Sequence, residues 1–399
     1  MNGPCISLDV SKGSSHYRLF LERNKPVGQA KIIAHKKSGF DQLLKEKKKL
    51  EAKANEEVTI VFESTGVYHK GLERYLKNNN CRYFMISPLL SAKVRKSNVR
   101  STKNDKKDCN TIAETYYTKD INNHPDNDHK YSNIRAKQRY YEFLIDGLKK
   151  YKVEFNRLLD IIYPEFDGLF TDLYSKAILE FLLKYPHPDM VRNSKIETIA
   201  RFIKKKSCHH DKVAMNMAIK IKKYLLECYS GCDRDEFYVE ELKCLIMEIL
   251  AKIAQIDEVL KEIIEMAKEL PGYENILTIP GIGENLAARL IAEIGDFDKY
   301  ENSRQLVASA GLDPTVYQSG QNDGKHLKIT KKGNKHLRTL LFLAVTCMIK
   351  NKHIHSTTLT EFNENKRASG LSPKAAKVAT MNKSLRIIYT LVKSDSRFI

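Results

Sequence analysis

The chain has 399 residues, of which 42% are hydrophobic, so it is long enough for two or three domains with cores of their own. Lys and Arg number 68 against 49 Asp and Glu, and the resulting formal charge of +19, spread along the chain, favours nucleic acid as the partner. No apolar run is long enough to span a bilayer, no signal peptide is evident and the eight cysteines are scattered, so we expect a cytoplasmic protein with reduced thiols and no membrane association.

The first 130 residues have the pattern of an α/β domain. Strands are expected over 5–10, 17–22, 28–34, 58–62 and 82–86, and helices over 38–54, over 67–79 and from about residue 105. Ser38 is a candidate N-cap for the first of these helices. This order of three strands, helix, strand, helix, strand and helix indicates an open α/β sheet.

Four acidic residues stand at the ends of these elements. Asp9 lies near the end of the first strand, Glu63 follows the fourth, and Asp105 and Asp108 are three residues apart at a helix start. Residues i and i+3 share a helix face, and ligands gather at the carboxyl ends of strands in open α/β sheets. The four carboxylates could therefore hold Mg²⁺ or Mn²⁺ for phosphodiester chemistry. Taken singly, each acid would also suit a turn, a loop or a solvated helix start.

These motifs resemble those of the DEDD insertion-sequence transposases. The matching pieces are residues 8–12, 62–68 and 102–108. The resemblance implies a ribonuclease-H-like, RuvC-like domain over residues 1–130. It also implies that Asp9, Glu63, Asp105 and Asp108 are the catalytic, metal-binding tetrad.

Residues 131–270 are expected to form a mostly helical middle region. The stretch 234–270 lacks Pro and Gly and carries apolar residues at spacings of three and four, which predicts a coiled-coil-like helix. Such a helix could join domains, pair two subunits or pack on the helix that begins near residue 131. A zinc site could be built from Cys208, His209, His210, Cys228 and Cys232. Zinc sites usually show tighter paired spacings, so structural thiols and surface histidines are favoured.

The remaining residues, 271–399, carry a helix, a Gly-rich turn and a second helix over 277–291. Gly281 and Gly283 of this helix-hairpin-helix pattern would leave backbone N–H groups facing a phosphate at a helix N-terminus. Ser319 precedes a glycine, in a setting where a serine is usually a turn residue. Basic side chains suited to phosphate contacts are Lys103, Lys106, Lys107, Lys325, Lys328, Lys331, Lys332, Lys335 and Arg338.

Residues 280–283, 310–314, 319–320 and 329–338 resemble the C-terminal transposase domain of the same family. In that family a loop serine attacks DNA and forms a covalent phosphoserine, and Ser319 matches its position. The resemblance implies a prokaryotic, nucleoid-associated recombinase that mobilises its own insertion sequence. A noncoding bridge RNA would pair with donor and target DNA, and the protein would act as a dimer of dimers. Two alternatives remain at this point: a metal-dependent, Holliday-junction-resolvase-like nuclease without serine chemistry, and a non-catalytic nucleic-acid-binding protein.

Overall fold

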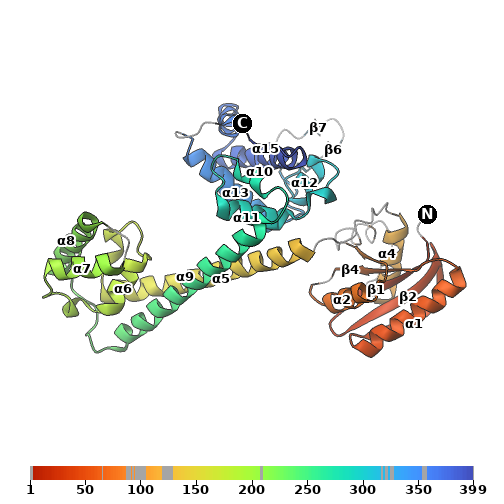
Figure 1. Cartoon of the computed structure of the whole chain (residues 1–399), viewed down its shortest axis with the longest axis horizontal. Coiled ribbons are helices and arrows are strands. Elements are labelled where there is room, and N and C mark those ends of the chain that lie inside the picture. The colour runs from red at the N-terminus through yellow and green to blue at the C-terminus, as the bar shows by residue number, and fades with distance from the viewer. Residues whose placement is uncertain are drawn as a thin grey trace. The chain divides into compact units, whose positions relative to one another are not determined.

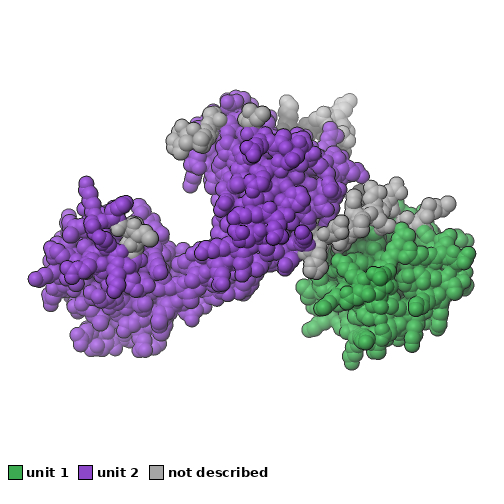
Figure 2. All heavy atoms as spheres, viewed as in Figure 1, with its two compact units in different colours: residues 1–125 green, residues 126–399 purple. Residues whose placement is uncertain are grey.

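The computed structural model forms two compact units, Met1–Pro125 and Asp126–Ile399, which are described separately (Figure 2). It describes residues 3–64, 66–86, 91, 94, 105–118, 129–206, 210–315, 318–319, 322–323, 328–352 and 357–398. For residues 105–107, 129, 318–319 and 322–323 only the backbone is described. No described helix has the length and apolar character needed to cross a membrane.

The first unit is a five-stranded mixed sheet with helices on both faces (Figure 1). Its elements are β1 (Cys5–Val10), β2 (Ser14–Glu22), β3 (Lys25–Ala34), α1 (Lys37–Ala54), β4 (Thr59–Glu63), α2 (Lys70–Asn78), β5 (Tyr83–Ile86) and α4 (Asp105–Thr118). The strand order is β3-β2-β1-β4-β5, in which β1, β2 and β3 are antiparallel while β4 runs parallel to both β1 and β5. This is the α/β sheet that the sequence predicts.

The capping role predicted for Ser38 is wrong. Helix α1 begins at Lys37, its N-cap position is Lys36, and no side chain caps it. The Lys36 N–H donates to the Ala34 carbonyl over 2.8 Å, so a tight backbone turn leads from β3 into the helix before Ser38 is reached.

Alternation along the strands sorts their side chains between two cores. Ile6, Leu8, Ile60 and Phe62 belong to the core that α1 and α2 cover. Cys5 and Val61 belong to the other core, together with Ile112, Ala113 and Tyr116 of α4. Odd-numbered positions of β1 and β4 therefore face α4, because side chains of a strand alternate between its faces.

The second unit is almost entirely helical. Its elements are α5 (His129–Ile162), η1 (Phe166–Leu169), α6 (Lys176–Lys184), η2 (Pro188–Met190), α7 (Ile196–Lys206), α8 (Asp211–Glu227), α9 (Phe237–Lys268), α10 (Tyr273–Leu277), α11 (Glu284–Ile294), η3 (Phe297–Lys299), α12 (Ser303–Ser309), β6 (Gln318–Ser319), β7 (Asn322–Asp323), α13 (Lys335–Lys350), α14 (Thr358–Ala368) and α15 (Pro373–Lys393). The short strands β6 and β7 pair as a hairpin.

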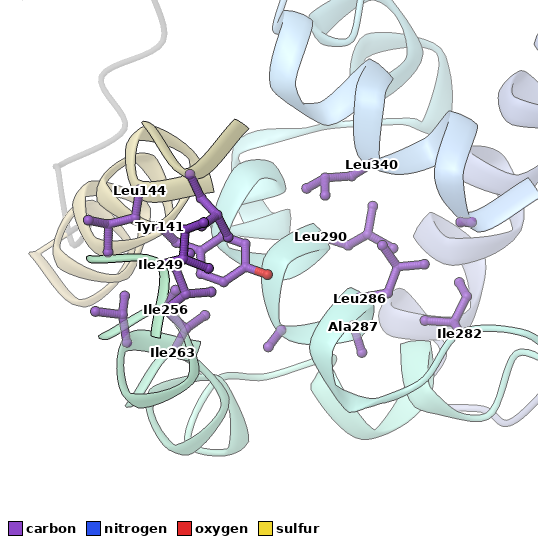
Figure 3. Packing of buried hydrophobic residues seen from close by; sticks show 14 of the residues in the cluster. Tyr141, Leu144, Ile249, Ile256, Ile263, Ile282, Leu286, Ala287, Leu290 and Leu340 are labelled. Atoms are coloured by element: carbon purple, nitrogen blue, oxygen red, sulfur yellow. The ribbon is translucent and has the colours of Figure 1, made fainter. Parts of the chain in front are cut away.

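Helices α5 and α9 pack against each other within the one chain, which is the intramolecular alternative for the long helix (Figure 1). Both helices also pack against α11, and Figure 3 shows buried apolar residues of all three helices that belong to one cluster. Helices α6, α7 and α8 gather near one end of the α5–α9 pair (Figure 1). One apolar core therefore runs continuously from this group of helices to the C-terminal ones.

Two neighbouring residues of α9 test this packing. Ile246 is fully buried, whereas Met247 is 52% exposed. Ile246→Ala should lower the free energy of unfolding by about 2–5 kcal/mol, because it removes buried methylene groups and leaves a cavity. Met247→Ala should change it by less than about 0.5 kcal/mol. Urea denaturation followed by far-UV circular dichroism measures both, and equal losses would contradict the packing of α9.

Candidate active site

The parallel register of β1 and β4 brings two of the predicted acids to one edge of the sheet. The last paired residues are Leu8 and Phe62, so the next pair along the strands is Asp9 and Glu63. Both occupy odd positions and lie on the face that α4 covers. Glu63 also accepts a hydrogen bond from the hydroxyl of buried Ser91 over 2.7 Å, which fixes the orientation of its carboxylate.

Helix α4 brings the third acid to the same face. Asp108 is 8% exposed and lies one turn before Ile112, which packs on the sheet. Asp105 is the first residue of α4, three positions earlier, and its side chain lies outside the described residues. The backbone thus places Asp105 and Asp108 on one side of the helix start.

Cys109 is a fully buried thiol next to Asp108, where α4 packs on β1 and β2. It donates to the backbone carbonyl of His16, the β2 residue paired with Asp9. The pKa of Cys109 is raised from 9.0 to about 12, chiefly by burial, with a smaller contribution from the negative charges of Asp9 and Asp108. The thiol therefore stays protonated and neutral at neutral pH.

The donor atoms at this edge suit a hard divalent cation, because they are carboxylate oxygens and the nearby thiol stays neutral. Among the described side chains, no group of three or more His, Cys, Asp or Glu is close enough together to hold a metal ion. Asp9, Glu63 and Asp108 are therefore candidate oxygen ligands, with Asp105 as the fourth, and their role in binding a metal stays a prediction.

The alternative zinc cluster gains no support from the described residues. Cys208 and His209 lie outside them. Cys228 donates its thiol to the hydroxyl of Tyr224, four residues earlier in the chain, and Cys232 lies against Ser230. Every cysteine that the structure describes is a free thiol.

Ser319 lies in strand β6, where it pairs with Asn322 of β7. Its side chain is outside the described part of the chain. The predicted loop serine thus lies in a short paired strand. The described backbone of this hairpin belongs to the second unit, while the acids belong to the first.

The two chain segments that lead into and out of the hairpin are paired at its base. The Thr315 N–H donates to the Lys328 carbonyl over 2.7 Å, and the Thr330 N–H donates to the Asp313 carbonyl over 2.9 Å. The Thr330 hydroxyl also donates to the Asp313 carboxylate over 2.6 Å. The two segments that flank the hairpin are therefore held together.

Two glycines let the backbone segments below this base touch. Gly311 has a φ of +65°, and a Cβ there would come within 2.9 Å of the Lys331 and Lys332 backbones. A Cβ on Gly333 would meet the Ser309 carbonyl oxygen at 2.3 Å. Any larger residue at either position would push apart the two segments that carry the hairpin.

A buried carboxylate ties this region to α5 and α11. The Glu293 side chain is fully buried and accepts from Arg139 over 2.8 Å and from the Asn334 side-chain amide over 2.6 Å. Asn334 in turn caps α13 by accepting from the N–H groups of His336 and Leu337, and its own N–H donates to the Ser309 carbonyl. The start of α13 and the turn after α12 are thus held together.

The predicted phosphate-contact residues differ in what they do in the structure. Lys328, Lys331, Lys332 and Lys335 are exposed around the hairpin base and the start of α13. Arg338 is half-buried and donates to the carbonyls of Ala310 and Gly333. Lys103 and Lys325 lie outside the described residues, and the side chains of Lys106 and Lys107 are not described.

The predicted Gly-rich turn joins α10, which has only five residues, to α11. Gly281 has a φ of +87°, and a Cβ there would meet Met348 of α13 at 3.0 Å, so this glycine is required for packing. Gly283 is the N-cap residue of α11 and has open space around it. The phosphate-binding role of both glycines stays a prediction.

Sequence reasoning missed Ser91, Glu293 and Asn334. Ser91 is an isolated serine, and no sequence pattern signals its contact with Glu63. Glu293 is the one acid in the otherwise apolar end of α11, Leu290–Ile294, and such a position signals a buried charge that needs a partner. Asn334 precedes the regular apolar spacing of α13 and could have been recognised as a cap.

The mixed sheet of the first unit, followed by a mostly helical remainder, fits a DEDD nuclease-like domain. Comparison with known families agrees: a profile of DEDD-type IS110 transposases matches residues 6–164. A second profile, described as the transposase IS116/IS110/IS902 family, matches residues 273–359. The chain belongs to this transposase family.

Several relatives carry names of the same kind. The pilin gene-inverting protein of Moraxella bovis is 29% identical over 147 residues, which are 37% of this chain and 45% of that protein. The transposase for insertion sequence element IS1111A of Coxiella burnetii is 32% identical over 160 residues, 39% of this chain and 43% of that protein. An uncharacterized protein of insertion element IS116 from Streptomyces clavuligerus is 23% identical over 61% of this chain and 60% of its own length. The chain thus matches less than two thirds of the length of each.

The buried thiol at the candidate metal edge can be tested by its protonation. Because its pKa is about 12 in the folded chain against an ordinary 9.0, Cys109 should resist alkylation by iodoacetamide at neutral pH, while exposed Cys244 reacts. Folding favours the neutral thiol, so its contribution to stability should be complete below pH 9 and decline as the pH rises toward 12. Peptide mass spectrometry reads the labelling, and equal labelling of both cysteines would contradict this environment.

Proposed function

We propose that the chain is a DNA transposase or recombinase that cleaves and exchanges DNA strands with two sets of groups. One set is the acids Asp9, Glu63, Asp105 and Asp108, and the other is the hydroxyl of Ser319. The observation that carries the proposal is the placement of Asp9 and Glu63 on one face at the ends of paired parallel strands, with Asp108 on the covering helix. Transposase profiles matching both parts of the chain support it.

The chemistry assigned to Ser319 is transesterification. Its Oγ forms a new bond to phosphorus, the bond from phosphorus to one sugar oxygen breaks, and that oxygen leaves with a proton as a free hydroxyl. The phosphodiester becomes a phosphoserine, and attack by a hydroxyl of another strand would release the serine and join the strands. A divalent cation, when bound, would polarise the phosphate oxygens and stabilise the leaving oxygen.

Exposed Lys328, Lys331, Lys332 and Lys335 stand at the base of the hairpin, where positive charge would attract a DNA backbone. The acids and Ser319 belong to different units, so one chain or two could assemble the site. We propose the second arrangement, a dimer of dimers with composite sites. A noncoding bridge RNA that pairs with donor and target DNA completes the proposal, and the formal charge of +19 is suited to binding both nucleic acids. Sequencing RNA that co-purifies with the full chain tests the RNA part.

Ser319→Ala should abolish the covalent protein–DNA adduct, since no other group is proposed to attack phosphorus. Ser309→Ala is the matched control, because Ser309 ends α12 and its hydroxyl donates to the Leu306 carbonyl. The adduct is measured with labelled supercoiled donor and target DNA on a denaturing gel. An adduct that persists in Ser319→Ala would refute the serine assignment. Free 5′-phosphate ends without any adduct would favour the resolvase-like alternative.

Asp108→Asn should weaken Mn²⁺ binding by more than the roughly 10- to 100-fold that loss of an outer-sphere partner causes, because it removes a direct oxygen ligand. Glu114→Gln, on the same helix but paired with Arg23, should leave Mn²⁺ affinity unchanged. Calorimetric titration of Mn²⁺ into the full chain measures both variants. If Asp108→Asn and Glu114→Gln bind Mn²⁺ like the parent, the acids are not a metal site and the non-catalytic alternative gains support.

A further inference from the structure

Helices α6, α7 and α8 form a small group near one end of the α5–α9 pair (Figure 1). They lie in the stretch 165–272, which neither family profile matches. Their mutual packing is apolar and well buried, with Phe181, Ile199 and Ile221 at 0% exposure. The three helices therefore form a rigid platform, in which the charged residues on the surface keep fixed positions relative to one another.

The stretch 192–223 of this platform is strongly basic, with ten Lys or Arg and only two acids. Four of its cations serve the fold. Arg192 donates to the carbonyls of Leu225 and Cys228 at the end of α8, and Lys222 donates to the carbonyls of Arg192 and Ser194. The two remaining pairs are Lys204 with Asp211 at 2.6 Å and Lys206 with Glu180 at 3.1 Å.

The other six cations make no such contacts with described residues. All six are exposed, and none has an ion pair or a side-chain hydrogen bond with another described residue; they are Lys195, Arg201, Lys205, Lys212, Lys220 and Lys223. We call this set the α7–α8 cation surface. Three of its members, Lys212, Lys220 and Lys223, share the side of α8 opposite buried Ala218 and Ile221.

We propose that the α7–α8 cation surface binds the phosphate backbone of double-stranded DNA, as a contact separate from the candidate active site. Five of the six cations are lysines, which act as point charges toward phosphates and do not provide the bidentate fork that reads guanine. Binding there releases counterions from DNA and carries no sequence preference. The choice of DNA rests on the proposed function, because DNA is the substrate that a transposase must hold.

An apolar stripe lies beside this surface on α8, formed by Met215, Ile219 and Leu226, which are 38%, 47% and 72% exposed. Such a stripe would contact a protein and would contribute little to a phosphate backbone. A DNA partner would depend on the lysines of α8, and a protein partner would depend on its apolar stripe. Variants of the two sets of residues therefore distinguish the two partners.

The test is the salt dependence of DNA binding by the full chain. Replacing Lys205, Lys212, Lys220 and Lys223 together by Gln should reduce the slope of log Kobs against log salt by about three to four in magnitude, since each lost phosphate contact removes about 0.9. Fluorescence anisotropy with a random-sequence DNA duplex measures the slope, and circular dichroism verifies that the variant is folded.

The matched control replaces four exposed lysines of α1 by Gln, namely Lys37, Lys45, Lys48 and Lys53, which removes the same charge from another domain. Its slope should match that of the parent. An equal fall in this control would overturn the proposal in favour of general electrostatics. A fall seen only with an RNA duplex of the same length would overturn the assignment to DNA.

A third variant, Met215→Ser with Ile219→Ser and Leu226→Ser, should keep the parent affinity for DNA. Loss of DNA binding in this variant, with no loss in the lysine variant, would overturn the proposal and indicate that α8 binds a protein partner. Duplex binding is measured without cleavage, so failure of the serine chemistry would leave the expected slopes unchanged and the two proposals can fail separately.

Discussion

Parallel pairing of β1 with β4 is the constraint on which the first unit depends. Hydrogen bonding in register from Cys5 to Leu8 carries Asp9 to the position beside Glu63. Apolar side chains on the opposite face, Ile6 and Phe62 among them, hold that register because a slip by one residue would turn them toward α4 and bury an acid in their place. The same packing that stabilises the sheet therefore keeps two like charges together at its edge, where only a cation or an ordered hydrogen-bond donor such as Ser91 offsets their repulsion.

Much of the secondary structure of the first unit could be predicted, because each strand is marked by the pattern of its own residues. The apolar, β-branched run before Glu63 and the alternation around Asp9 mark strands by themselves. The start of α1 could not be predicted from Ser38, since a Cβ on Gly39 would lie 2.2 Å from the Ala34 carbonyl, and this backbone contact sets where the helix begins. The contact between Ser91 and Glu63 depends on residues 28 positions apart, and no local pattern encodes it.

The second unit shows the same division between local and distant signals. Helices α5 and α9 follow from their apolar spacing, and the basic segment before α13 was visible in the sequence. The hairpin at Ser319 and its clamped base could not be foreseen, because they depend on two glycines in different segments, Gly311 and Gly333, meeting in space. Glu293 then ties this base to α5 through Arg139, because the buried carboxylate requires a cation as its partner.

The pairing of α5 with α9 also affects how the chain is made. Helix α5 leaves the ribosome with its apolar face uncovered, and α9 follows only after the whole stretch from η1 to α8 has been synthesised. At about 5–20 residues per second, the nascent chain spends several seconds in this state. Helices α6, α7 and α8 contact one another and can begin to pack during that delay, which shortens the effective loop that α9 must close. Helices α6, α7 and α8 would then guide the co-translational packing of α9 on α5.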